Sequence, residues 1–386
     1  MITDRVADLL GVDHTDIDPD GDLIAQGLDS IRMMTLAGQW RRAGFDIDFA
    51  RLAAAPSVRA WAELLTPAER PEPVLAEALR ADGEPFAMAP MQHAMWIGRH
   101  ADQQLGGVAG HLYVEFDGAA VDPQRIRRAA AQLAARHPML RVEFLSDGTQ
   151  RIGTSADPLP VAVVDLRSVD DATVEQRLAA TRADKSCQQL DGQVLELTLT
   201  LLPRDRTRLH VDLDMQAADA MSYRALMADL AGLYRGDLLA EIGYTYQHYR
   251  QQLSPPDSFD ADRQWWADKL PELPDAPALP LVPLAQQADP RRAGRRWHWL
   301  DPATRDGLFD RARQRGVTPA MTLAASFADT VAGWSADPRF LLNVPLFGRE
   351  PLHHDVDKVV GDFTSSLLLD IDLAAADTPA QRARAV

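Results

Sequence analysis

Apolar residues near the N-terminus of the chain recur with the spacing of amphipathic helices. The first such run contains Ile2, Val6, Leu9 and Leu10. A second run opens at Ser30 and ends near Gly44, and a third covers residues 57–65, where Ser57 is placed as the N-cap. Because no strand-like alternation interrupts these runs, the pattern predicts an all-α, four-helix unit over residues 1–66.

The pattern changes after a polar segment at residues 67–84, whose prolines and charges are typical of a semi-rigid linker. Beyond it, short runs alternate apolar and polar residues like strands, and longer runs have helical spacing. This mixture predicts an α+β lobe over residues 85–270. Its expected strands lie at 111–118, 194–203 and 207–216, and its expected helices at 122–140 and 222–236.

A second lobe is expected at residues 271–386. The proline-rich stretch 270–283 is predicted to run extended and to cross into it. The last residues, "TPAQRARAV", are typical of the start of a helix, so this lobe is expected to be incomplete. Its expected helices lie at 302–317 and 318–335, and its expected strands at 339–347 and 365–373.

Charge and composition narrow the classes of function. The chain has 56 acidic and 40 basic residues, a formal net charge of −16, whereas a nucleic-acid partner requires a basic face. The single cysteine, Cys187, excludes an internal disulfide framework and indicates a reducing compartment. No apolar run is long enough to span a membrane, and the acidic N-terminus is unlike a signal peptide. We therefore expect a cytoplasmic protein without a nucleic-acid partner.

Ser30 admits two interpretations. A serine before an apolar run is commonly a helix N-cap. The stretch Gly27-Leu28-Asp29-Ser30, followed by Ile31 and Met34 in a helical unit of this size, also resembles the attachment site of acyl and peptidyl carrier proteins. That resemblance implies 4′-phosphopantetheine linked to the Ser30 hydroxyl, Asp29 as a recognition residue, and a phosphopantetheinyl transferase as a partner. A helix N-terminus also tolerates the charge of a phosphate.

The stretch "LHVDLDMQAADAMS", residues 209–222, places ionisable side chains on one face of an expected strand. His210, Asp212 and Asp214 alternate with apolar residues and so point to the same side. Three such groups are not buried without partners. The pattern therefore predicts either a solvated edge face followed by a helix that Ser222 caps, or a functional site.

The spacing of three residues favours the functional interpretation. Asp214, Asp219 and Ser222 match the Asp-x4-Asp-x2-Ser signature of heterocyclization domains, which are relatives of the condensation domains of nonribosomal peptide synthetases. Condensation domains have His-His-x3-Asp-Gly at this place. Met215 stands where their second histidine would be, and methionine cannot transfer a proton. The resemblance therefore points to the heterocyclization branch, with these three signature residues as its catalytic candidates.

Five other stretches resemble motifs of the same family in the same order, so the resemblance covers nearly the whole chain. It implies a two-lobed fold like that of chloramphenicol acetyltransferase, with a tunnel between the lobes. Arg99 lies in the first of these motifs and is expected near the tunnel. The five stretches are residues 86–100, 136–141, 270–281, 318–335 and 343–372.

A carrier directly before a heterocyclization domain resembles the arrangement of siderophore synthetases that start from an aryl acid. That arrangement implies a salicyl thioester on the arm at Ser30 as donor, serine or threonine on a downstream carrier as acceptor, and a hydroxyphenyl-oxazoline as product. The implied partners are a salicylate-activating adenylation enzyme and the downstream adenylation and carrier domains. Family members place a cyclodehydrating Thr and Asp late in the second lobe, and no counterpart precedes Val386.

The same resemblance suggests a structural role for one of the two aspartates at the tunnel centre. Asp219 is expected to pair with an arginine of the second lobe, and Arg349 in "PLFGRE" is the predicted partner. A guanidinium can hold a carboxylate through two parallel hydrogen bonds, so this pair is expected to fix the lobes together.

Histidines leave two further alternatives open. His210 is either a satisfied strand histidine or, through its His-x3-Asp spacing to Asp214, the base of a stand-alone acyltransferase. His353 and His354 beside Asp355 and Asp357 suggest a metal, but without supporting ligand spacing elsewhere a loop at the tunnel rim is favoured. A non-catalytic carrier and docking unit is the remaining rival to the synthetase function.

Overall fold

The computed structural model describes most of the chain, and the statements below concern these residues alone. Their contacts divide the chain into two units: Met1–Val74, Pro255–Val344 and Ser366–Val386 form the first, and Leu75–Ser254 with Pro345–Ser365 the second. The domain boundaries expected from the sequence remain predictions. The described residues are 2–10, 12–24, 26–28, 32–33, 36–37, 40, 45, 47, 49–65, 83–100, 106–107, 109–154, 159–186, 190, 192–253, 260–286, 296–350, 352–373, 378 and 381–382.

The N-terminal residues form helices around one apolar core. Trp61 anchors this core, since its indole Nε1 donates to the Leu52 carbonyl at 3.0 Å and its ring meets Trp40 edge-on at 5.5 Å. Ser57 caps α4 as predicted, because its side chain accepts from the Ala60 N–H. The helices are α1 (Ile2–Leu10), α3 (Phe49–Ala54) and α4 (Val58–Leu64), with a 3-10 turn η1 (His14–Asp16).

The second unit is built on a four-stranded sheet in the order β2-β7-β6-β5. The first three of these strands pair antiparallel, and β5 pairs parallel to β6. The strands expected from alternation are thereby confirmed, and the sheet also contains β5, which the pattern did not predict. The bounds are β2 (His111–Ala119), β5 (Val161–Asp165), β6 (Leu195–Leu201) and β7 (Arg206–Asp214).

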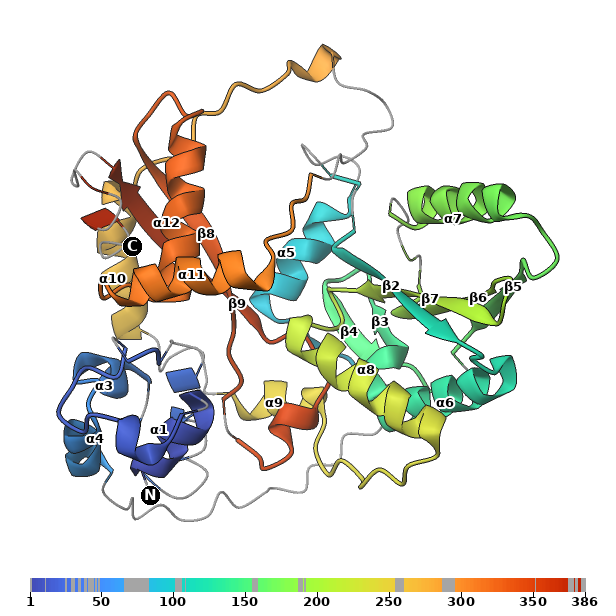
Figure 1. The fold of residues 1–386 in the computed structure, drawn as a ribbon, viewed down its shortest axis with the longest axis horizontal. Helices are drawn as coiled ribbons and strands as arrows, with labels where there is room; N and C mark the ends of the chain where they lie inside the picture. Colours follow the sequence, from blue (N-terminus) through green and yellow to red (C-terminus); the bar gives the residue numbers. More distant parts are fainter. Residues whose placement is uncertain are drawn as a thin grey trace. The chain divides into compact units, whose positions relative to one another are not determined.

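The two faces of this sheet differ in chemistry. Leucines and valines on one face, among them Leu197, Val211 and Leu213, pack in a buried core with α6 (Pro123–Arg136) and α8 (Ala220–Arg235). Helix α7 (Asp171–Lys185) lies on the other side of the sheet (Figure 1). On that side β6 and β7 present Thr200, His210 and Asp212, which are buried, and the Thr200 hydroxyl lies 3.2 Å from His210 Nε2.

Smaller elements complete the second unit. A three-stranded sheet has the order β1-β4-β3, with β1 (Phe86–Ala87), β3 (Val142–Phe144) and β4 (Thr149–Ile152). Gln92 on α5 and Gln150 on β4 bond each other in the interior, and Gln92 also donates to the Gln216 carbonyl at 2.8 Å. These bonds tie α5 to the small sheet and to the end of β7. The remaining elements are α5 (Pro90–Gly98), η2 (Pro138–Arg141), α9 (Tyr246–Gln252) and η6 (Val356–Lys358).

The second-lobe elements expected from the sequence are present. Two helices, α11 (Pro302–Arg313) and α12 (Pro319–Ala332), and a two-stranded sheet of β8 (Arg339–Phe347) and β9 (Thr364–Asp372) confirm the pattern. Residues 273–283 carry no helix or strand, which agrees with the extended crossing. The other elements are α10 (Asp260–Lys269), η4 (Leu270–Glu272) and η5 (Leu284–Gln286).

Large apolar side chains remain exposed on α12 and in the chain that flanks α11 and α12. Their two small cores are built around Val317 and around Phe340, and these cores do not cover every face of α12. Over the part of the chain that the structure describes, no helix is both long and apolar enough to cross a bilayer. The exposed side chains include Trp297, Trp299, Leu323, Phe327 and Trp334.

Candidate functional site

Ser30 lies outside the described residues, as do Asp29, Ile31, Met34 and Gly44. The chain on either side of it is described. Leu28 and Met33 are buried in the N-terminal helical core, and the Arg32 guanidinium donates to the Gly27 carbonyl at 3.2 Å. Both ends of the stretch that contains Ser30 are therefore anchored in the core.

Asp214 is the last residue of β7 and is 3% exposed. Its carboxylate lies 2.5 Å from the Arg99 guanidinium and accepts the Gln216 N–H at 2.9 Å. Burial raises the pKa of Asp214 above its ordinary value, and Arg99 opposes that shift. The structure thus brings together two of the residues that the sequence singled out, on one end of the sheet.

Asp219 and Ser222 lie at the start of α8, and both are fully buried. The prediction that Ser222 caps this helix is wrong: Asp219 is the N-cap and accepts the Ser222 N–H at 2.6 Å. A carboxylate three residues upstream is the stronger acceptor for the free N–H groups of a first turn, which leaves the Ser222 hydroxyl free for other bonds.

The predicted partner of Asp219 is in place but binds differently from the expectation. Arg349 contacts Asp219 through one nitrogen, Nη2, at 3.2 Å, so the pair is not joined by two parallel hydrogen bonds. The same nitrogen lies 3.0 Å from the Ser222 hydroxyl, and Nη1 donates to the carbonyls of Val356 and Val359 at 2.9 and 2.5 Å. Arg349 therefore joins α8 to its own loop.

The contacts of the other Asp219 oxygen explain why Arg349 touches Asp219 through only one nitrogen. It accepts the Phe363 N–H at 3.3 Å, while the Asp219 N–H donates to the Gly361 carbonyl at 3.0 Å. The Ser222 hydroxyl donates to the Gly361 carbonyl at 2.8 Å and accepts the Gly361 N–H at 3.1 Å. Asp219 and Ser222 thus hold residues 361–363 against α8, and we call these contacts the α8 clamp.

Gly361 has no room for a side chain. A Cβ at this position would lie 2.1 Å from the Tyr246 ring, and Tyr246 is itself held by a 2.6 Å bond to the Asp362 carbonyl. Gly361→Ala is expected to lower the free energy of unfolding by at least about 2 kcal/mol, because a buried ring must move. Urea denaturation measures the change. Gly348→Ala, in the same segment with open space around it, is the control, and equal loss in both variants contradicts the prediction.

The polar face of β7 is buried at His210, Asp212 and Asp214, which excludes the solvated edge that the sequence left open as one of two alternatives. Asp212 has no exposed surface and lies between two nitrogen donors, Lys185 Nζ of α7 at 2.6 Å and His111 Nε2 of β2 at 3.1 Å. His111 is the cross-strand partner of Asp214. Neither Lys185 nor His111 was identified from the sequence. His111 begins an alternating run, and the register in which that run pairs with β7 would have placed His111 on this polar face.

His210 is a satisfied strand histidine. It is fully buried, its Nδ1 lies 2.7 Å from the Tyr113 hydroxyl, and its Nε2 lies 3.2 Å from the Thr200 hydroxyl. Tyr113 donates to Glu115, a carboxylate paired with arginines, so Tyr113 accepts from Nδ1–H and Thr200 donates to Nε2. Burial lowers the pKa of His210. With both nitrogens bonded, His210 has no free atom for acid–base chemistry.

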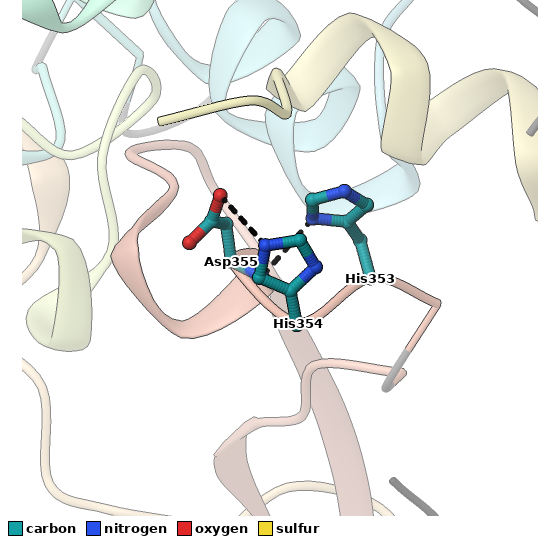
Figure 2. Close-up of side chains that lie close together, drawn as sticks. All are labelled: His353, His354 and Asp355. Atoms are coloured by element: carbon teal, nitrogen blue, oxygen red, sulfur yellow. Dashed lines mark hydrogen bonds and ion pairs between the residues drawn. The ribbon is translucent and has the colours of Figure 1, made fainter. Parts of the chain in front are cut away.

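His353, His354 and Asp355 lie close together in the loop before η6 (Figure 2). The Asp355 carboxylate accepts from Lys358 Nζ at 2.7 Å and from the Gly243 N–H at 3.1 Å. Burial alone would raise the pKa of Asp355, but these donors hold it below its ordinary value. The Asp355 N–H donates to His353 Nδ1 at 3.0 Å, which in neutral imidazole leaves the proton on Nε2 and no lone pair for a metal. The geometry favours a structural role, in which these side chains hold the loop before η6 in place.

Comparison with known families defines the class of this protein. Residues 84–386 match the condensation domain family, and residues 2–65 match the phosphopantetheine attachment site. The chain therefore belongs to the condensation domain family and begins with a phosphopantetheine attachment domain. The family resemblance, the carrier-plus-condensation fold and the covalent cofactor inferred from the sequence are confirmed.

Individual relatives show which kinds of synthetase the chain is similar to. The chain is 60% identical to phenyloxazoline synthase MbtB of Mycobacterium tuberculosis over all of its own length, and 37% identical over 97% of its length to pyochelin synthetase PchE of Pseudomonas aeruginosa. It spans 28% and 27% of these two proteins. The EpoB cyclization-docking bidomain of Sorangium cellulosum aligns with 78% of the chain and 61% of its own, at a TM-score of 0.66 and 31% identity.

Proposed function

We propose that this chain is the loading and first-condensation part of a nonribosomal peptide synthetase that makes a siderophore of the mycobactin type. The observation that supports this most is the 60% identity to phenyloxazoline synthase MbtB over the whole chain. The name of that relative specifies an oxazoline that bears a phenyl group. The product proposed for this chain is accordingly a hydroxyphenyl-oxazoline made from salicylate and serine or threonine.

Ser30 is the proposed attachment point of 4′-phosphopantetheine. Its hydroxyl is the group that forms the phosphodiester, and its neighbours Leu28 and Met33 are buried, so the stretch between them is anchored at both ends. When attached, the arm supplies a thiol that carries the salicyl group as a thioester. The tether raises the effective concentration of the acyl group at the condensation domain.

Two bond-forming steps follow from the proposed product. The amine of the acceptor bonds to the thioester carbonyl carbon, and the carbon–sulfur bond breaks, which gives an amide. The side-chain hydroxyl of the acceptor then bonds to the amide carbonyl carbon, and one water leaves as the oxazoline closes. Both reactants are held on carriers, so each step gains from orientation rather than from free collision.

We divide the predicted site residues between two roles. Asp214 and Arg99 lie at the end of β7 and are the candidates for contact with the reacting groups. Asp219, Ser222 and Arg349 are fully or largely buried and bonded to each other and to backbone, so their proposed role is to hold the frame of the site. Loss of activity in their variants would then follow from altered structure.

The proposed partners are a phosphopantetheinyl transferase, a salicylate-activating adenylation enzyme, and downstream adenylation and carrier domains that present serine or threonine. The proposed compartment is the cytoplasm, which is consistent with a chain that has one cysteine.

The first experiment tests the carrier. The chain is incubated with coenzyme A and a promiscuous phosphopantetheinyl transferase, and its intact mass is recorded. One phosphopantetheine increment is expected for the wild type, and none for Ser30→Ala. Ser57→Ala, which removes a helix-capping hydroxyl in the same domain, is the control and should keep the increment. A folded wild-type chain that gains no mass contradicts the proposal.

The second readout separates the enzyme from its rivals. Salicyl-loaded chain is mixed with a seryl or threonyl thioester on a separate carrier, and the product mass is measured. An amide, with or without loss of one water, supports the synthetase function, whereas loading without any amide leaves the docking unit. Amide formation by Ser30→Ala from a free thioester would support an acyltransferase, which the buried and fully bonded His210 does not favour.

A further inference from the structure

The polar face of the main sheet carries a second histidine whose surroundings differ from those of His210. His111 is the first residue of β2, pairs across the strands with Asp214, and shares a face with Asp212. Directly paired residues on antiparallel strands have Cβ atoms about 5 Å apart. His111 therefore stands beside the Asp214–Arg99 pair, at the end of the sheet where the signature residues begin.

Hydrogen bonding fixes which nitrogen of His111 holds the proton. Asp212 is fully buried, and its Oδ2 lies 2.6 Å from Lys185 Nζ, so it is held as a carboxylate that only accepts. The His111 Nε2 lies 3.1 Å from the other oxygen, Oδ1, and must donate to it. In the neutral ring the lone pair is consequently on Nδ1.

That second nitrogen is available. Among the described residues, His111 Nδ1 has no hydrogen-bond partner, whereas both nitrogens of His210 are occupied. The side chain of His111 is 8% exposed, so burial and Asp212 orient the ring while a small part of it remains accessible to solvent. A carboxylate that orients an imidazole and leaves its far nitrogen free is the arrangement that general bases use.

We infer that His111, oriented by Asp212 and Lys185, is the proton acceptor of this site. It supplies the imidazole that the signature lacks at Met215, and it sits beside Asp214, whose carboxylate is already engaged by Arg99 and by the Gln216 N–H. The inference rests on the proposed function.

The proposed step balances within the condensation. The acceptor nitrogen bonds to the thioester carbonyl carbon, and the nitrogen loses one proton to His111 Nδ1. The carbon–sulfur bond breaks, and the thiolate takes up one proton, so no net proton is consumed. The charged groups that face the His111 imidazole are Asp212 and Asp214 of β7, Lys185 of α7 and Arg99 after α5.

Kinetics on the pantetheine-loaded chain tests the role. His111→Gln is expected to lower kcat for amide formation at least about 100-fold with little change in KM, and to remove the acidic limb of the pH–rate profile. His93→Gln, an exposed histidine of α5 stacked on Trp96, is the matched control and should keep the wild-type rate and profile. Equal rates and equal profiles in wild type and His111→Gln overturn the inference.

A measurement that needs no turnover tests the geometry. Nitrogen-15 NMR of the imidazoles in the full 386-residue chain is expected to show His111 protonated on Nε2 and bare on Nδ1 in its neutral form. Protonation on Nδ1 instead overturns the inference, whatever the kinetics. If the loaded wild type forms no amide at all, the proposed function fails, and the tautomer then decides whether this histidine has the free nitrogen claimed for it.

Discussion

Arg349→Met is expected to lower the free energy of unfolding of the chain by about 3–5 kcal/mol, the range for removing one partner of a buried ion pair. The reason is that Arg349 is the only cation bonded to Asp219 among the described residues, and Asp219 is fully buried. The substitution also removes the donors to Val356 and Val359 and to the Ser222 hydroxyl. Methionine keeps most of the packing over the Phe363 ring, which the guanidinium covers at 4.0 Å.

Urea denaturation followed by tryptophan fluorescence measures this loss, and Arg339→Met is the matched control. Arg339 pairs with Asp370 on the surface, so its replacement is expected to cost no more than about 1 kcal/mol. The double variant Arg349→Met with Asp219→Asn should regain part of the stability, because the carboxylate left without its cation is gone. A stable Arg349→Met chain that loses only activity would mean that Arg349 acts in the chemistry rather than in the frame.

Local signals in the sequence predicted much of the fold. The alternation at 207–216 predicted β7, and Gly236 at the end of α8 was correctly placed, since its φ of 92° is one that glycine adopts without strain. Ser57 was correct as an N-cap because its side chain accepts from a backbone N–H only three residues further along the chain. These features depend on residues close together in sequence, which a single chain displays directly.

The misassigned features depend on residues far apart in sequence. The polar face of β7 was predicted as solvated or functional because nothing near it showed that α7 and β2 would cover it. Lys185 lies 27 residues before Asp212, and His111 lies 101 residues before it. Arg349 was paired correctly with Asp219 through family resemblance, but its single-nitrogen contact depends on where the backbone of residues 356–363 lies, which no residue pattern shows.

Asp362 has an unusual environment for a carboxyl group in this frame. It is 1% exposed, its Oδ1 accepts the Thr364 N–H at 3.0 Å, and its Oδ2 has no partner among the described residues. Burial raises the pKa of Asp362 to about 6, hydrogen bonds from Thr364 oppose the shift, and the nearby Asp219 charge adds to it. The folded state therefore binds a proton more tightly than the unfolded chain, in which an aspartate has a pKa near 3.8.

The sign of the pH dependence follows from that difference. Below about pH 4 Asp362 is protonated in both the folded and the unfolded chain, so it does not change the free energy of unfolding. Between about pH 4 and 6 only the unfolded chain loses the proton, so the free energy of unfolding falls as pH rises. Above about pH 6 the loss is complete at about 3 kcal/mol, since one pKa unit corresponds to about 1.4 kcal/mol. Asp362→Asn is uncharged throughout and should escape this loss.

The test compares urea denaturation of wild type and Asp362→Asn at pH 4, 6 and 8. Asp362→Asn is expected to gain stability relative to wild type as pH rises, with most of the gain reached by pH 6 to 7 and about 3 kcal/mol at pH 8. Asp370→Asn, at a carboxyl paired with Arg339 whose pKa is held below its ordinary value, is the control and should show no such gain. A difference between wild type and Asp362→Asn that stays constant from pH 4 to 8 would mean that Asp362 is ionised in the folded protein, and that a donor outside the described residues satisfies its second oxygen.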